Sequence, residues 1–240
     1  MLASGVLAQE LTFHNNAVHL GAAKAATQGT VNVFDYDPPG RSNYYYDQAV
    51  AKNLVVLHHT AGWFWGDLDT LTQNNNHVSV AFVVARSGWI YRLFDPTRWS
   101  YHLGPGTVGD NEFNSKRAIA IEISNVGELQ VAGNDVKFGN SKYCGTDENQ
   151  YYATLPAPYR GYSAYAKFTD AQYTAVNELL TQLCGEFAIP RTFLPMNQRF
   201  NVFGSDAAAR SYTGIASHVN FRPTGKTDIG PVFDWPRIGG

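Results

Sequence analysis

The chain has 240 residues, of which 44% are hydrophobic and 16% are charged, and its formal net charge at pH 7 is −2. This balance is typical of a globular domain with a proper core and excludes an intrinsically disordered chain. The small net charge gives no electrostatic reason to expect nucleic acid or an anionic membrane as a partner. No apolar run reaches the roughly 18 residues that a membrane span needs.

Residues 1–52 are expected to form an N-terminal extension of the main domain. They include residues 35–40, a turn-rich stretch that resists regular structure. Residues 1–9 lack the basic segment and the full apolar stretch of a signal peptide, although residues 6–8 are similar to the end of one. A shortened export signal and an ordinary N-terminus therefore both remain open, and we expect a secreted or cell-envelope location.

Apolar segments in the next part of the chain predict the strands of a sheet. Residues 54–57 form a continuous apolar run, which is typical of a strand buried on both faces. Residues 78–85 predict a second strand, and the turn after it makes residues 89–93 its hairpin partner. Residues 119–123 predict a third apolar strand.

Residues 127–168 differ from the rest because they are rich in Gly, Asn, Pro and Tyr and show no clear periodicity. So long a segment indicates a functional insertion or an irregular flap. A helix should follow, with Thr169 as its N-cap and Gln172 completing a capping box. Its apolar face would consist of Val176, Leu179, Leu180 and Leu183. Strands interleaved with helices predict an α/β fold: a single domain with a central mixed β-sheet flanked by helices.

Histidine and carboxylate side chains stand at the ends of two predicted strands. His58 and His59 end the first strand, His218 follows a short strand near the C-terminus, and Asp228 lies in the loop beyond it. Imidazole and carboxylate ligands suit Zn²⁺, and a catalytic zinc site uses three of them and keeps a fourth position open. Buried histidines that merely hydrogen-bond within the core are the alternative, and the pattern alone leaves both interpretations open.

Four segments, taken in order, resemble the zinc amidase and peptidoglycan-recognition-protein family, which includes phage lysozyme-type amidases. They are residues 55–62 (VVLHHTAG), residues 99–104 (WSYHLG), residues 119–123 (IAIEI) and residues 217–235, which contain GKTDIGPVFDW. The match covers about residues 53–238 and implies an amidase domain over residues 53–240. That family's fold, a mixed sheet flanked by helices, agrees with the predicted elements.

The resemblance also implies which residues carry the chemistry. His58, His218 and Asp228 would bind one Zn²⁺ per chain, which lowers the pKa of water towards neutrality. Glu122 would be the general base and acid, because a carboxylate inside an apolar strand should have a raised pKa. Lys226 would stabilise the oxyanion. The alternatives are a glutamate that faces solvent on an edge strand and an ordinary loop lysine.

On the substrate side of the predicted cleft, the resemblance places His102, His59 and Thr60. His59 would support its neighbouring ligand rather than bind the metal. Many relatives carry Tyr or His in the strand at Val80 and Ala81, where this chain is apolar, so more of the catalytic work would fall on Glu122.

The predicted reaction is hydrolysis of the amide bond between N-acetylmuramic acid and L-alanine, with peptidoglycan or muropeptides as the partner. A recognition module without catalysis is the main alternative, and the presence of all three ligand-type residues argues against it. A zinc hydrolase acting on another amide also remains open. Cys144 and Cys184 belong to no C-x-x-C pair and could form a disulfide or remain thiols. The sequence does not indicate an oligomeric state.

Overall fold

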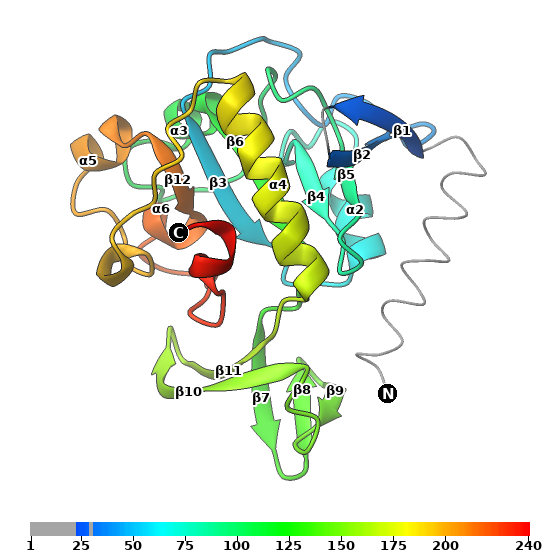
Figure 1. Ribbon diagram of the computed structural model, residues 1–240, viewed down its shortest axis with the longest axis vertical. Coiled ribbons are helices and arrows are strands. Elements are labelled where there is room, and N and C mark those ends of the chain that lie inside the picture. The colour runs from blue at the N-terminus through cyan, green and yellow to red at the C-terminus, as the bar shows by residue number, and fades with distance from the viewer. Residues whose placement is uncertain (1–22, 29–30) are drawn as a thin grey trace.

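The computed structural model describes residues 23–28 and 31–240, and within them a central seven-stranded sheet runs through the main body (Figure 1). In sheet order its strands are β1 (Ala23–Gln28), β2 (Val31–Tyr36), β5 (Ile90–Arg92), β4 (Phe82–Val84), β6 (Ala118–Ile123), β3 (Leu54–His59) and β12 (Gly214–Ser217). The sheet is mixed, because β4 and β5 are antiparallel whereas β4, β6, β3 and β12 are parallel neighbours. The predicted α/β fold with a mixed sheet is confirmed.

The centre of the sheet is formed by the strands that the apolar runs predicted. All six residues of β3 are buried, as expected for a strand covered on both faces. The predicted hairpin partner is β5, which pairs antiparallel with β4. The strand expected over residues 78–85 is shorter than predicted: only Phe82–Val84 are in a ladder, and Val78 makes an isolated bridge to Tyr101.

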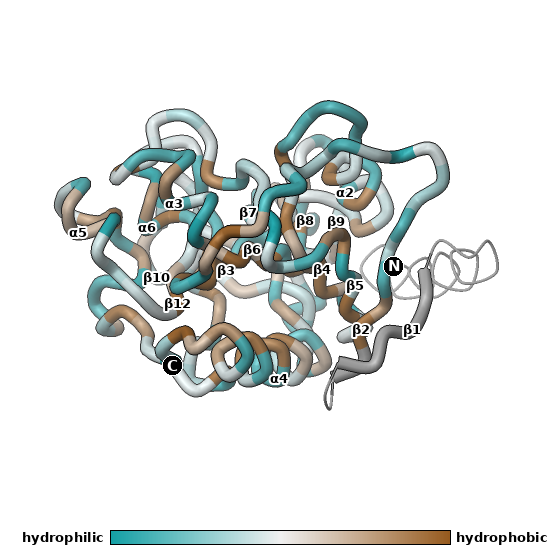
Figure 2. The backbone as a smooth tube through the Cα atoms, turned by 90° about the horizontal axis from the view of Figure 1, so that it is seen from above, coloured by the Kyte–Doolittle hydropathy of each residue, from teal (hydrophilic) through white to brown (hydrophobic). Residues whose placement is uncertain are grey.

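Helices flank this sheet, and Figure 2 places α4 on one side of it and α2 and α3 on the other. The helices are α2 (Phe64–Leu71), α3 (Asn111–Arg117), α4 (Asp170–Glu186), α5 (Asp206–Ser211) and α6 (His218–Phe221), with short 3₁₀ segments at Met196–Gln198 and Trp235–Ile238. The predicted capping box is confirmed: Thr169 accepts from the backbone N–H of Gln172, whose side chain accepts in return from the Thr169 N–H. The predicted apolar face of α4 is fully buried, so this helix closes the main core.

Of the two alternatives for residues 127–168, a functional insertion or an irregular flap, the flap is wrong. The segment forms a second, five-stranded antiparallel sheet that lies below the main body in Figure 1. In sheet order its strands are β10 (Tyr152–Tyr159), β11 (Tyr162–Ala166), β7 (Glu128–Ala132), β8 (Asp135–Phe138) and β9 (Ser141–Gly145). It encloses a small core of its own, which includes Leu129, Val136 and Tyr143. Register shifts in β10 and between β8 and β9 interrupt the alternation that would have revealed these strands.

Cys144 and Cys184 are both free, buried thiols in the structure. Cys144 lies in the core of the second sheet, whereas Cys184 lies on α4 in the main core. Because the two cysteines lie in different cores, they are separate thiols in the structure and form no disulfide with each other.

The boundary predicted at residue 53 stays a prediction, although residues of the expected extension join the main sheet. β2 pairs in parallel with β5, and β1 pairs with β2. The expectation about residues 1–9 lies outside the described residues. In the described part of the chain, no helix is both long and apolar enough to cross a bilayer.

Candidate active site

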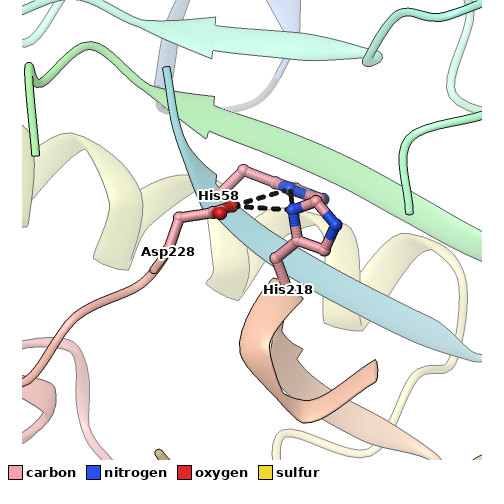
Figure 3. A group of neighbouring side chains, drawn as sticks. All are labelled: His58, His218 and Asp228. Atoms are coloured by element: carbon pink, nitrogen blue, oxygen red, sulfur yellow. Dashed lines mark hydrogen bonds and ion pairs between the residues drawn. The ribbon is translucent and has the colours of Figure 1, made fainter. Parts of the chain in front are cut away.

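The three predicted metal ligands come together at one edge of the central sheet. β3 and β12 are adjacent and parallel, so their carboxyl ends meet at the same edge. His58 lies near the end of β3, His218 begins α6 directly after β12, and Asp228 reaches in from the following loop (Figure 3). All three side chains are buried.

The ligand atoms of these residues form a nearly equilateral triangle. His58 Nδ1 and His218 Nδ1 lie 3.0 Å apart, and Asp228 Oδ2 lies 3.2 Å from the first and 2.9 Å from the second. Tetrahedral ligands at about 2.0–2.1 Å from Zn²⁺ are separated by about 3.3 Å, which is close to these distances. Among the described residues, this is the group of His, Cys and acidic side chains that could hold a metal ion.

The hydrogen bonds around the triangle also suit a cation. His218 donates from Nε2 to the carbonyl oxygen of Leu103 at 2.9 Å, so a neutral His218 turns a lone pair on Nδ1 towards the Asp228 carboxylate. Burial, together with the charge of His218, lowers the pKa of His58 to about 4. Burial acts to raise the pKa of Asp228, but the two histidines outweigh it and hold that pKa well below its usual range. Imidazole nitrogen lone pairs next to a carboxylate oxygen are the ligand atoms that a metal ion such as Zn²⁺ requires.

Glu122 lies beside this triangle on the neighbouring strand. It is the direct partner of His58 in the parallel ladder between β3 and β6, and side chains at paired positions point to the same face of a sheet. The side chain as a whole is partly exposed, whereas its Oε2 atom is enclosed and has no hydrogen-bond partner. Burial, followed by the charges of Asp228 and Asp67, raises the pKa of Glu122 well above its usual value. β6 is a central strand between β3 and β4, so Glu122 does not occupy the solvent-facing edge position considered above.

Lys226 lies in the loop that leads to Asp228, and its side chain is exposed. Its positive charge opposes the rise in the pKa of Glu122 and contributes to the lowered pKa of His58. The charge of Lys226 therefore bears on a candidate ligand and on Glu122.

A family model described as N-acetylmuramoyl-L-alanine amidase matches residues 48–231 of the chain. The chain belongs to the N-acetylmuramoyl-L-alanine amidase family. The family resemblance that the four sequence motifs indicated is thus confirmed. No curated protein sequence matches the chain significantly.

Several solved structures align with the chain, and AmiD from E. coli shares its fold. The amidase AmiD from E. coli aligns with a TM-score of 0.51 at 20% identity, over 81% of this chain and 59% of that one. The chain thus spans less than two thirds of AmiD. An AmpD derivative aligns with a TM-score of 0.44 at 19% identity, over 83% of this chain and 97% of that one. The amidase LysC from Clostridium intestinale aligns with a TM-score of 0.44 at 16% identity, over 87% of this chain and 95% of that one.

His102 contacts a candidate ligand, His58. Its Nδ1 lies 3.0 Å from His58 Nε2, while its own Nε2 is enclosed and has no hydrogen-bond partner. Burial, followed by the charges of His58 and His218, lowers the pKa of His102 well below its usual value. The ring is placed to orient His58, and the substrate contact predicted for His102 stays a prediction.

His59 and Thr60 face the base of the second sheet. His59 points to the opposite face of β3 from His58, and its Nε2 lies 3.9 Å from a carboxylate oxygen of Glu128. A Cβ atom at Gly127 would lie 2.4 Å from the same nitrogen, so only glycine lets the backbone pass so close. The hydroxyl of Thr60 accepts from the backbone N–H of Asn125 at 3.2 Å. The sequence predicted that His59 would not bind the metal, and in the structure His59 lies outside the metal triangle. The substrate roles of His59 and Thr60 stay predictions.

Asp67, in the first turn of α2, is a carboxylate near the site that the sequence analysis did not identify. Burial raises its pKa to about 7, although a hydrogen bond with Thr60 and the charge of His59 oppose this. Its Oδ2 atom is enclosed without a hydrogen-bond partner, and its charge contributes to the raised pKa of Glu122. Its position soon after the HHTAG motif was the available signal.

Proposed function

We propose that this amidase uses Zn²⁺, about one ion per chain, to hydrolyse the amide bond between N-acetylmuramic acid and L-alanine in peptidoglycan or muropeptides. The observation that carries the proposal is the buried triangle of His58, His218 and Asp228 with Glu122 in register beside it. The choice of substrate is supported by the family and by AmiD, whose structure is a complex with anhydro-N-acetylmuramic acid-L-Ala-D-gamma-Glu-L-Lys. Because peptidoglycan lies outside the cytoplasmic membrane, we also propose a secreted or cell-envelope location.

His58, His218 and Asp228 would hold the ion, which when bound polarises a carbonyl group and makes water a better nucleophile. Glu122 takes up the proton that the attacking water loses and passes it to the alanine nitrogen as that nitrogen leaves. Its raised pKa, caused by burial and by neighbouring carboxylates, brings its acid–base range closer to neutrality. The enclosed and unpartnered Oε2 atom of Glu122 is available for this proton.

Lys226 would act on the oxygen of the scissile carbonyl. That oxygen gains negative charge only as water attacks, so a nearby ammonium stabilises the transition state more than the bound substrate. The influence of Lys226 on both His58 and Glu122 supports this placement.

Metal depletion and reconstitution test the proposal. Chelator-treated protein should lose muropeptide hydrolysis and regain it with about one equivalent of Zn²⁺ per chain. The His218→Ala variant should not bind zinc, and added Zn²⁺ should not restore its muropeptide hydrolysis. His77→Ala is a matched control, because His77 stacks on Tyr46 away from the triangle. Full activity of rigorously metal-free protein would refute the zinc mechanism, and zinc binding without hydrolysis would favour a recognition module.

A further inference from the structure

The turn between β10 and β11 carries an arginine where the backbone disfavours one. Tyr159 and Tyr162 pair across the hairpin, so Arg160 and Gly161 form a two-residue turn. Both have positive φ angles, 50° at Arg160 and 92° at Gly161. Such turns favour Asn-Gly, because a bulky side chain in the left-handed region is strained. Residues in strained backbone conformations are found mainly at functional sites, so the strain at Arg160 suggests that its side chain has a functional role.

The Arg160 side chain reaches from the second sheet to the segment that follows His218. Its guanidinium donates to the carbonyl oxygens of Lys226 at 2.5 Å, Arg222 at 2.8 Å and Val219 at 3.4 Å. One planar group thus joins three points of a single stretch of backbone. Several donors in a fixed fork are what distinguish arginine from lysine in such a role.

That stretch of backbone positions two of the three candidate ligands. His218 begins α6, and the N–H of Val219 donates to the carbonyl oxygen of Asp228 at 2.8 Å. Between α6 and Asp228 the chain has no regular secondary structure, and residues 223–226 are exposed. The geometry of the triangle therefore depends on contacts that hold this loop from outside.

A second contact from the same sheet holds the loop directly beside Asp228. The hydroxyl of Thr227, the residue before Asp228, donates to a carboxylate oxygen of Glu128 at 2.8 Å. Glu128 is the first residue of β7, which lies next to β11 in the second sheet. The added sheet thus holds the loop at Lys226, through Arg160, and at the adjacent Thr227, through Glu128.

We propose that Arg160 is a positioning residue of the metal centre, through which the added sheet fixes the loop that carries Lys226 and Asp228 relative to His218. The inference rests on the proposed function, because it assumes that these residues hold a metal ion. Groups that orient metal ligands commonly change metal affinity or activity by 10–100-fold when they are removed.

The decisive variant is Arg160→Asn, because Asn-Gly is the preferred pair for this turn and the hairpin keeps its conformation without the guanidinium. The dissociation constant for zinc, measured by competition with a chelator, should rise by at least about tenfold. At saturating zinc, kcat should fall and KM should stay unchanged, because the loop carries the metal and oxyanion groups. Arg160→Lys, which restores a positive charge with fewer donors, should recover part of both effects.

Arg191→Ala is the matched control. Its guanidinium also donates to a backbone carbonyl, that of Ile238 at 3.0 Å, but it bonds none of the residues at the metal triangle. Wild-type zinc affinity and turnover in Arg160→Asn would overturn the inference, whereas failure of the wild-type protein to bind zinc would overturn the proposed function itself. If the Asn variant does not fold, the Lys variant decides. Undiminished zinc affinity and kcat in Arg160→Lys would likewise show that the three hydrogen bonds of the guanidinium do not position the metal centre.

Discussion

Replacing Glu122 by Gln keeps the shape of the side chain but removes its capacity to accept a proton. Turnover should therefore fall by roughly 10²–10⁴-fold, the usual contribution of a general base or acid. This corresponds to about 2.7–5.4 kcal/mol of activation free energy, at about 1.36 kcal/mol for each factor of ten. Zinc content should remain at the wild-type level, because Glu122 lies beside the metal triangle and is not part of it.

The same change should stabilise the metal-free protein at neutral pH. The Oε2 atom of Glu122 is enclosed without a partner, and the charges of Asp228 and Asp67 help burial to raise its pKa. A carboxyl group with a raised pKa supports folding below the pKa of the unfolded chain, and this support is lost as the pH rises. The advantage of Glu122→Gln should thus be absent near pH 4 and of order 1 kcal/mol at pH 7, because each pKa unit between the folded and unfolded chain corresponds to about 1.36 kcal/mol.

Two assays examine these expectations. Steady-state kinetics on a defined muropeptide gives the loss in turnover, and thermal unfolding in the presence of a chelator at pH 4 and pH 7 gives the change in stability. Glu186→Gln, at the exposed end of α4, is the control and should change neither quantity. Wild-type turnover in Glu122→Gln would show that the proton acceptor lies elsewhere. A loss of stability at pH 7 would contradict the electrostatic account of the site.

Three further experiments test other parts of the molecule. Lys226→Ala should retain zinc and KM but lose about 3 kcal/mol of transition-state stabilisation; a higher KM with unchanged kcat would show that Lys226 only holds the substrate. His102→Ala removes the ring that lies 3.0 Å from His58 Nε2, so zinc binding in a chelator competition should weaken by about 10–100-fold, and an unchanged affinity would reject the orienting role. Thiol titration of denatured, unreduced protein should find both Cys144 and Cys184 reactive, whereas no reactive thiol would show a bridge between them.

The parts of the fold that were predictable carry a strong local signal. The apolar run of β3 and the capping box at Thr169 depend on neighbouring residues, and both appear in the structure as predicted. The candidate ligands were found because His58 and His218 stand at strand ends within motifs that resemble a family. That β3 and β12 are neighbours depends on contacts between distant parts of the chain, which periodicity does not report.

The second sheet shows what the sequence could not reveal. The register shifts in two of its strand pairings, so the alternation of apolar and polar residues is broken. The role of Arg160 depends on carbonyl groups that lie far along the chain, and no motif marks it. Asp67 was missed for a related reason: an acidic residue in the first turn of a helix is common, so its closeness to the HHTAG motif was a weak signal, and its enclosed position is visible only in the structure.

The central claim is that the protein cuts the bond between N-acetylmuramic acid and L-alanine. Mass spectrometry of the products that zinc-loaded protein releases from purified peptidoglycan tests it most directly. We expect stem peptides with a free L-alanine amino terminus and glycan strands whose muramic acid lacks a peptide, and neither product with His218→Ala. Products cut within the glycan or within the stem peptide, or no products from zinc-loaded protein, would contradict the assignment.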